Sequence, residues 1–354
     1  MLTVLIPSHN EGTIADGSAQ ITETLESLAA QTNRPDRIVV IADNCNDDTV
    51  ELATELGADV FETVDNTDKK AGALNQWLRI NLPALPNDDL VMVMDADSAL
   101  YPDFLENALG YIAKGHHAVG GVFLGKPGGG FIGMLQRNEY ARYARDVERK
   151  NGKTLVLTGT ATVFTVKCLK DVIEGRRTGK IPGSDSGEPD VYDTKALTED
   201  NELTFALLHL GYKIIAPRSC GLTTEVMSTW GDLWRQRYRW KRGAIENNWH
   251  YGFTRYTLKY WFLQFWGALG ILATITYLVT LTYAITTGNV HIHLIWTLVT
   301  IVYMLERTVT VAARGAKQRL LAALLIIEMP YDLFLQTVHT KAVVTSIFRT
   351  SKSW

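Results

Sequence analysis

The stretch Leu90-Val91-Met92-Val93-Met94-Asp95-Ala96-Asp97 decides the fold. Five apolar residues in a row are typical of a strand buried on both faces, and the acidic residues after them mark its carboxyl end. Upstream, β-rich runs alternate with amphipathic helical stretches. The expected strands cover residues 2–6 and 37–42, and the expected helices cover residues 18–31 and 48–57. This alternation predicts an α/β domain with a mostly parallel sheet of the nucleotide-binding kind.

Polar clusters follow three of these strands. They are Pro7-Ser8-His9-Asn10-Glu11, Asp43-Asn44 and Asp95-Ala96-Asp97. Ligands of open parallel sheets bind beyond the carboxyl ends of the strands, where all three clusters would fall. Chance placement of polar residues in loops explains any one cluster equally well. It explains the convergence of three clusters much less well.

The expected phosphate holder is a metal ion rather than a glycine loop. The sequence has no G-x-G-x-x-G after a strand and no G-x-x-x-x-G-K-[ST]. Asp95 and Asp97, two residues apart at a strand end, suit Mg²⁺ or Mn²⁺, which take one or two carboxylates plus phosphate oxygens. A lone D-x-D pair is more often a solvated turn, so this prediction depends on the other motifs.

Charge is distributed unevenly along the 354 residues, whose formal net charge is -3. Residues 1–260 hold 28 Lys and Arg against 35 Asp and Glu, whereas residues 261–354 hold 7 against 3. A basic, apolar tail behind an acidic body suits an anionic lipid surface and argues against nucleic-acid binding.

The cysteines and the start of the chain point to a cytoplasmic body. Cys45, Cys168 and Cys220 are odd in number and share no metal-ligand or disulfide spacing, which fits a reducing compartment. Strand-like residues begin at Leu2 and leave no room for a cleavable signal peptide.

The order of the motifs resembles that of family 2 inverting glycosyltransferases, in the membrane-bound branch that includes cellulose and hyaluronan synthases and lipid glycosyltransferases. The resemblance covers about residues 1–245. The motifs that carry it are Pro7 to Glu11, Asp43-Asn44-Cys45-Asn46-Asp47-Asp48-Thr49, Lys69-Lys70-Ala71-Gly72-Ala73-Leu74-Asn75, Asp95-Ala96-Asp97, Thr198-Glu199-Asp200 and Gln236-Arg237-Tyr238-Arg239-Trp240.

The resemblance implies a GT-A fold, a nucleotide-sugar donor, most often a UDP-sugar, and bound Mg²⁺ or Mn²⁺. By that resemblance Asp97 would hold the metal. The implied donor-binding residues are Pro7, Asn10, Glu11, Asp43, Lys70 and Asp95. Asn44 is a departure, because many relatives have a second Asp there.

Asp200 is the predicted catalytic base. Inverting transfer needs one carboxylate that accepts the proton of the acceptor hydroxyl and one site that neutralises the leaving diphosphate. Asp200 precedes the apolar-periodic residues 203–210, so it would lie near a helix N-terminus, where the ionised form is favoured. A plain N-cap looks the same, and the order of the other motifs favours the base.

Residues 230–243 carry five basic residues between Trp230, Trp234 and Trp240. Arg and Trp side chains can clamp a diphosphate and stack under a sugar or acceptor. An amphipathic interfacial helix has the same composition, and both interpretations can hold. The predicted acceptor- and diphosphate-binding residues are Glu199, Gln236, Arg239 and Trp240.

Two further stretches have plainer interpretations. Residues 175–195 are rich in glycine, proline and acidic residues and fit a lid or a surface insertion equally well. The basic residues along 134–150, among them Arg142 and Arg145, indicate a solvated or lipid-facing helix side.

The last third predicts membrane helices. Residues 261–287 and 288–305 contain no charged residue, and about 20 apolar residues span a bilayer. Two transmembrane helices turning near Gly288 are therefore expected, with a buried soluble hairpin as the alternative. Residues 320–338 contain Glu328, Pro330 and Asp332, which favour a broken, re-entrant or interfacial arrangement.

These features predict a cytoplasmic GT-A catalytic domain at residues 1–228, interfacial amphipathic helices at 229–260 and membrane helices at 261–354. Two or three mostly apolar helices cannot enclose a polar pore for a polymer within one chain. The predicted acceptor is therefore a membrane lipid such as diacylglycerol or a polyprenyl phosphate. A processive β-polysaccharide synthase is the alternative, and a homo-oligomer would make it feasible. A membrane-tethered nucleotide sensor without catalysis is the hypothesis from another class.

Overall fold

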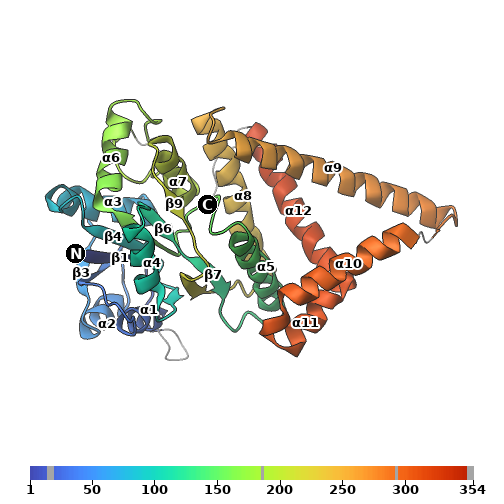
Figure 1. Ribbon diagram of the computed structural model, residues 1–354, viewed down its shortest axis with the longest axis horizontal. Helices are drawn as coiled ribbons and strands as arrows, with labels where there is room; N and C mark the ends of the chain where they lie inside the picture. Colours follow the sequence, from blue (N-terminus) through green and yellow to red (C-terminus); the bar gives the residue numbers. More distant parts are fainter. Residues whose placement is uncertain (14–19, 185–186, 292–293, 349–354) are drawn as a thin grey trace. The chain divides into compact units, whose positions relative to one another are not determined.

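The computed structural model describes residues 1–13, 20–184, 187–291 and 294–348 (Figure 1). The chain forms two compact units. The first contains residues 1–126 and 146–225, and the second contains residues 127–145 and 226–354. Each unit is described by itself.

The first unit is built on a seven-stranded sheet with the order β3-β2-β1-β4-β8-β6-β9. Strands β3, β2, β1 and β4 are parallel neighbours, and β8 runs antiparallel to β4 and β6. The predicted α/β class with a mostly parallel sheet is therefore confirmed. The strands are β1 (Leu2–Ser8), β2 (Arg37–Ala42), β3 (Asp59–Glu62), β4 (Leu90–Met94), β6 (Ala118–Gly120), β8 (Ala161–Thr165) and β9 (Ile214–Ile215).

A second, three-stranded sheet follows the order β5-β10-β7. It contains β5 (Ala99–Leu100), β7 (Val122–Gly125) and β10 (Gly221–Thr224). Because β5 begins two residues after Asp97, this sheet starts close to the carboxyl end of β4.

Helices connect the parallel strands. In α1 the residues Ile21, Leu25 and Leu28 are buried and recur at helical spacing, so one face packs on the core. The first two residues of the helix expected at 18–31 lie outside the described residues. The helices of this unit are α1 (Gln20–Ala29), α2 (Thr49–Glu55), α3 (Lys69–Asn81), η1 (Leu82–Ala84), α4 (Phe104–Ala113), α6 (Val166–Arg177) and α7 (Glu199–His209).

The second unit is helical, and α8 packs along α12. Leu135, Leu233, Leu321 and Tyr331 form a buried cluster that joins its helices. The helices are α5 (Gly130–Arg149), whose last turn belongs to the first unit, α8 (Trp230–Tyr251), α9 (Leu258–Thr286), α10 (Leu294–Thr310), η2 (Ala312–Arg314), α11 (Ala316–Ala323) and α12 (Leu325–Ile347).

Within the described part of the chain, α9 is the one single helix that is long and apolar enough to cross a bilayer. It has 29 residues and is not buried within the structure. The second predicted span corresponds to α10, which has only 17 residues and carries Glu306 and Arg307, so it does not meet the same measure. The third predicted stretch is broken, with a bend of 72° between α11 and α12, and counts as a further span only if the bent pair is one span.

Candidate functional site

The polar clusters of the first unit follow the carboxyl ends of its parallel strands, as expected. β1 ends at Ser8, β2 at Ala42 and β4 at Met94. Asp43 donates its backbone N–H to the carbonyl of Ser8, which links the first two clusters. Asn10 and Asn44 have positive φ angles of 56° and 50°, which Asn adopts more readily than most residues. The loops after β1 and β2 thus contain tight turns at the carboxyl edge of the sheet.

Asp43 is buried and held by three donors. Its Oδ1 accepts hydrogen bonds from Thr63 Oγ1 at 2.9 Å, Asn66 Nδ2 at 2.7 Å and Asn44 Nδ2 at 3.1 Å. Asn44, the departure from the family pattern, therefore donates to the neighbouring carboxylate, which a second Asp could not do in its ionised form. Asn10 Oδ1 accepts from the backbone N–H of Asn46 at 2.9 Å and fixes the facing loop.

Lys70 in the first turn of α3 is the cation at the centre of the site. Its Nζ lies 2.5 Å from Asp95 Oδ1 and 3.6 Å from Glu199 Oε1. It also donates to the carbonyl of Gly159 at 3.3 Å. Burial opposes the charge on Lys70, but the attraction of Asp95 and Glu199 outweighs burial and raises the pKa of the ammonium. Lys70 therefore stays charged and joins the strand end of β4 to α7.

Asp95 and Asp97 are half-buried carboxylates with other acidic residues close by. Burial raises the pKa of both, and their mutual repulsion adds to the rise for Asp95. Burial, then Asp97 and Asp95, raises the pKa of Glu11 to about 7. Among the described residues, the hydrogen-bond donors to Asp97 Oδ1 are two hydroxyls, from Ser98 at 3.2 Å and Thr224 at 3.4 Å. Such crowded carboxylates are stabilised by a cation.

The residues fit a divalent metal that also binds a ligand. No group of three or more His, Cys, Asp or Glu side chains that could hold a metal occurs among the described residues. Mg²⁺ and Mn²⁺ at phosphate sites need only one or two carboxylates, since phosphate oxygens and water complete the coordination. Asp97, with Asp95 beside it, supplies that donor set.

Asp200 is the second residue of α7 and not its N-cap. The N-cap is Thr198, whose side chain makes no capping hydrogen bond. Asp200 Oδ2 accepts from the backbone N–H of Gly159 at 3.0 Å, and Oδ1 accepts from the N–H of Asn201 at 2.7 Å. Burial and then repulsion from Glu199 raise the pKa of Asp200 to about 6. A carboxyl group with that pKa can take up a proton near neutral pH.

A pocket opens beside Asp200. Lys70, Gly159, Tyr192, Glu199 and Asp200 are among the residues that line it. A Cβ on Gly159 would lie 2.8 Å from Lys70 Nζ, so glycine leaves the room that the ammonium uses. One pocket of the first unit therefore holds a fixed cation, Lys70, and a carboxyl group with a raised pKa, Asp200.

The stretch 175–195 is fastened to the core at several points, within its described residues. Asn75 exchanges two hydrogen bonds with the backbone of Tyr192, at 2.8 and 3.1 Å. Arg79 pairs with Asp190 at 2.5 Å. The fully buried Arg176 binds Glu202 at 2.6 Å and the carbonyl of Val191 at 3.2 Å. These bonds fix the position of Tyr192 as a wall of the pocket.

Sequence reasoning missed four site residues. Lys126 follows β7, is nearly buried and pairs with Glu23 at 2.7 Å and Glu225 at 3.3 Å, close enough to Asp97 to stabilise its charge. Thr204 Oγ1 donates to the carbonyl of Asp200 at 2.7 Å and accepts from the N–H of Leu157 at 3.0 Å. Gly159 and Tyr192 complete the set. Of these four residues, only Gly159 could have been noticed in the sequence, and a single glycine in a loop is a weak signal.

Gln236, Arg239 and Trp240 lie on α8 in the second unit. Arg239 is exposed, whereas Gln236 and Trp240 are partly buried. Between them Arg237 has a side chain that is only 3% exposed and pairs with Glu139 of α5 at 2.9 Å. Trp230 and Trp234 pack edge-on against Phe334 of α12, with ring centroids 5.0 and 5.7 Å apart.

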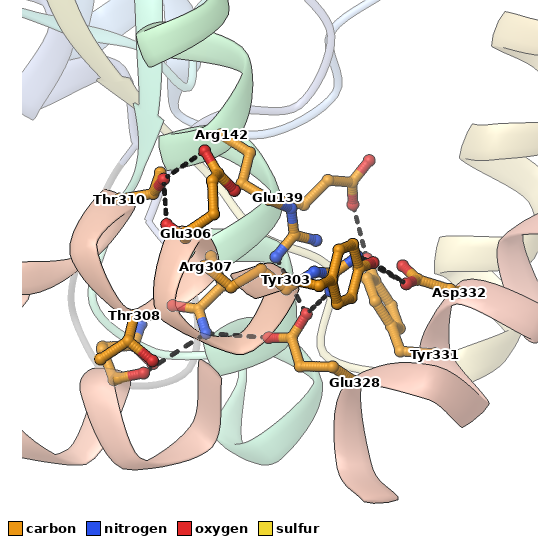
Figure 2. A network of polar contacts seen from close by, with 12 residues as sticks. Glu139, Arg142, Tyr303, Glu306, Arg307, Thr308, Thr310, Glu328, Tyr331 and Asp332 are labelled. Atoms are coloured by element: carbon orange, nitrogen blue, oxygen red, sulfur yellow. Dashed lines mark hydrogen bonds and ion pairs between the residues drawn. The ribbon is translucent and has the colours of Figure 1, made fainter. Parts of the chain in front are cut away.

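A buried polar network joins α5, α10 and α12 in the second unit (Figure 2). Glu328, 1% exposed, accepts from Arg142 at 2.9 Å, from Asn138 at 3.1 Å and from Arg307. Arg307 also pairs with Asp332 at 2.6 Å. The expectation of a solvated or lipid-facing helix side along 134–150 is therefore wrong for Arg142, because a carboxylate from a distant part of the chain meets it.

Comparison with known proteins identifies the family to which the chain belongs. The family described as Glycosyltransferase like family 2 matches residues 2–243. The chain belongs to this family. The suspected resemblance is confirmed by a match that covers every motif from Pro7 to Trp240.

Two curated relatives have similar degrees of identity. Poly-beta-1,6-N-acetyl-D-glucosamine synthase of Staphylococcus aureus is 26% identical over 259 residues, which cover 69% of this chain and 55% of the relative. The probable glycosyltransferase YdaM of Bacillus subtilis is 27% identical over 263 residues, which cover 68% and 54%. The chain thus spans about half the length of the curated relatives it matches.

A solved structure confirms the predicted GT-A fold. A mannosyltransferase from Pyrobaculum calidifontis in complex with GDP-Man and Mn²⁺ superposes with a TM-score of 0.61. The alignment covers 99% of this chain and 88% of the other at 17% identity. At that identity the likeness shows the fold.

Proposed function

We propose that this chain is a metal-dependent, inverting glycosyltransferase that moves a hexose from a UDP-sugar to a membrane lipid. The observation that carries the proposal is the pocket in which Asp200, fixed by the Gly159 amide, lies beside the Lys70–Asp95 pair. A base and a charge-stabilising group are the two elements that the displacement requires.

In the proposed reaction Asp200 takes the proton of the acceptor hydroxyl as its oxygen attacks the anomeric carbon of the sugar. The bond from that carbon to the diphosphate oxygen breaks, and the electron pair leaves with the diphosphate. One displacement inverts the anomeric configuration, so a single carboxylate base suffices. Lys70 stabilises the negative charge that develops nearby.

Asp97 and Asp95 would hold Mg²⁺ or Mn²⁺, whose chemistry is to neutralise the diphosphate oxygens. The mannosyltransferase that shares the fold binds GDP-Man and Mn²⁺, which supports a nucleotide-sugar and a divalent ion here. By motif resemblance, we assign Pro7, Asn10, Glu11 and Asp43 to the donor. Glu199, Gln236, Arg239 and Trp240 are assigned to the acceptor and diphosphate in the same way.

We propose attachment to the cell membrane through α9, with the catalytic domain on the cytoplasmic face. The exposed side chains of Trp249 and Phe253 meet Trp261 in aromatic contacts with centroids 4.8 and 4.5 Å apart, just where α9 begins. Tryptophan at the end of an apolar helix is typical of the membrane interface. The domain boundaries at residues 228 and 260 stay a prediction.

A processive polysaccharide synthase is the second candidate. It is favoured by the curated relative that is a poly-beta-1,6-N-acetyl-D-glucosamine synthase. The lipid acceptor is favoured by the single long apolar helix among the described residues, since one or two helices do not enclose a pore.

The test is a screen of nucleotide-sugars that measures release of the nucleoside diphosphate in the presence of lipid vesicles. The proposal expects release that depends on a divalent ion and a product that partitions into organic solvent. A long water-soluble product would support the polysaccharide synthase. Absence of release with every donor and lipid would contradict the proposed transfer.

A further inference from the structure

Arg237 lies inside the motif Gln236-Arg237-Tyr238-Arg239-Trp240 and has no assigned role. Its guanidinium donates to Gln236 Oε1 and lies 4.4 Å from the centroid of the Trp240 ring. The same side chain therefore contacts two of the residues that the proposed function assigns to acceptor or diphosphate. A guanidinium over an indole face is attracted by its quadrupole, so Arg237 restrains the ring as well as the amide.

Glu139 fixes Arg237 from the neighbouring helix α5. Arg237 Nε donates to Oε1 at 3.2 Å and Nη2 donates to Oε2 at 2.9 Å, which makes the pair bidentate. Such a fork holds the plane of the guanidinium as well as its position. Burial of Glu139 would raise the pKa of its carboxyl, but Arg237 outweighs burial and lowers it. The pair therefore stays ionised.

Tyr331 of α12 completes the chain of contacts. Its hydroxyl donates to Glu139 Oε2 at 2.6 Å. The next residue, Asp332, and the nearby Glu328 belong to the network of Arg142 and Arg307 (Figure 2). Glu328 thus fastens α12 to α5 and to α10, Asp332 fastens it to α10, and the Tyr331 hydroxyl reaches Glu139 of α5 directly.

We infer that Arg237 is a positioning residue, held by Glu139 and through it by Tyr331, which sets the side chains of Gln236 and Trp240 for transfer. This inference rests on the proposed function for those two residues. It assigns helix α12 a role in activity, because the Tyr331 hydroxyl of α12 donates the last hydrogen bond in this series of contacts.

A merely structural role would also make Tyr331 important for stability, so a matched control is needed. Tyr303 provides it. Its hydroxyl binds Asp332 at 3.1 Å and Arg307, within the same network, but no hydrogen bond or ion pair joins it to Glu139 or Arg237 in the described structure. Tyr331→Phe and Tyr303→Phe each remove one hydroxyl that binds a charged side chain, although the Tyr331 ring is buried and the Tyr303 ring is 43% exposed.

The experiment compares both variants in the full-length protein for turnover, donor KM and amide hydrogen exchange of residues 236–240. We expect Tyr331→Phe to lower kcat about tenfold with little change in donor KM, as losing one hydrogen bond to a charged group permits. We also expect it to speed exchange at 236–240. Tyr303→Phe should leave kcat and that exchange as in the wild type, even if both variants unfold at the same lowered temperature.

Equal kcat and equal exchange in the two variants would overturn the inference. The exchange measurement needs no turnover, so it decides the positioning contact even if no donor is ever transferred. A wild-type protein without transfer would count against the proposed function, whereas faster exchange only in Tyr331→Phe would still support the contact. Arg237→Lys is a further check. It keeps the positive charge but cannot form the bidentate pair with Glu139, so its kcat should stay below that of the wild type.

Discussion

The acidic site of the first unit and the buried network of the second both bring carboxylates and cations together, but the site has an excess of carboxylates and the network has equal numbers of the two. At the site, Glu11, Asp95, Asp97, Glu199 and Asp200 outnumber the lysines that face them, Lys70 and Lys126. In the network, Glu139, Glu328 and Asp332 meet Arg142, Arg237 and Arg307.

The difference shows in the pKa values. Crowding and burial raise the pKa of Asp95, Asp97, Asp200 and Glu11. In the other unit Arg237 lowers the pKa of Glu139 despite its burial. An unbalanced cluster reduces stability until a cationic ligand arrives, and a balanced cluster maintains the fold. The predictions below test that contrast.

The largest effect is expected in the network. Glu328→Gln leaves Arg142 and Arg307 without their shared counter-charge, which should lower the free energy of unfolding by about 3–5 kcal/mol. Denaturant unfolding of the full chain in detergent measures it. Asp146→Asn removes the exposed partner of Lys150 and serves as the control, with an expected loss below about 1 kcal/mol. Equal losses would remove the contrast between buried and exposed pairs.

The next largest effect is expected on divalent-metal binding. Asp97→Ala should weaken Mn²⁺-dependent donor binding at least about a hundredfold, since changing a group that merely supports a metal ligand already costs about 10- to 100-fold in affinity. Titration with UDP, with and without the divalent ion, measures the change. Asp88→Ala, an exposed acid before β4, should bind like the wild type. Wild-type binding that ignores divalent ions would contradict the metal assignment.

A smaller effect is expected from the raised pKa of Asp200. The pKa of Asp200 is raised from 3.8 to about 6, so folding favours its protonated form. The associated stability is fully present below about pH 4 and is lost as the pH rises through about 6. Asp200→Asn cannot ionise, although it gives up one of the two backbone hydrogen bonds that Asp200 accepts, so its stability relative to the wild type should rise by about 1–3 kcal/mol between pH 4 and pH 8. Unfolding midpoints at both pH values decide it; a stability difference between variant and wild type that does not change from pH 4 to pH 8 would contradict the raised pKa of Asp200.

The smallest predicted effect concerns Thr204. Thr204→Val keeps the shape but loses both hydrogen bonds that join the loop before β8 to the start of α7, and kcat should fall about tenfold. Thr204→Ser should retain most of the activity, because the hydroxyl remains. A valine variant as active as the serine variant would show that the hydroxyl does not position the base.

Much of the first unit could be predicted because its signals are local. The strands at 37–42 and 90–94 coincide with β2 and β4, and their apolar runs alone mark them. Asp43, Asp95 and Asp97 could be placed on one edge because parallel topology brings strand ends together. For Asp200 the pattern left base and N-cap open; the structure shows that Thr198 is the cap residue.

The remaining features depend on contacts that no local pattern encodes. Arg142 looks like one of several basic residues on a helix, and its partner Glu328 lies 186 residues away. Lys126 and Gly159 gain their roles from side chains of other strands and helices.

The central claim is tested most directly by Asp200→Asn, with transfer and donor binding measured on the same preparation. The account predicts that transfer falls about 10²- to 10⁴-fold while the affinity for the nucleotide-sugar changes by no more than about twofold. Transfer at the wild-type rate in Asp200→Asn would contradict it.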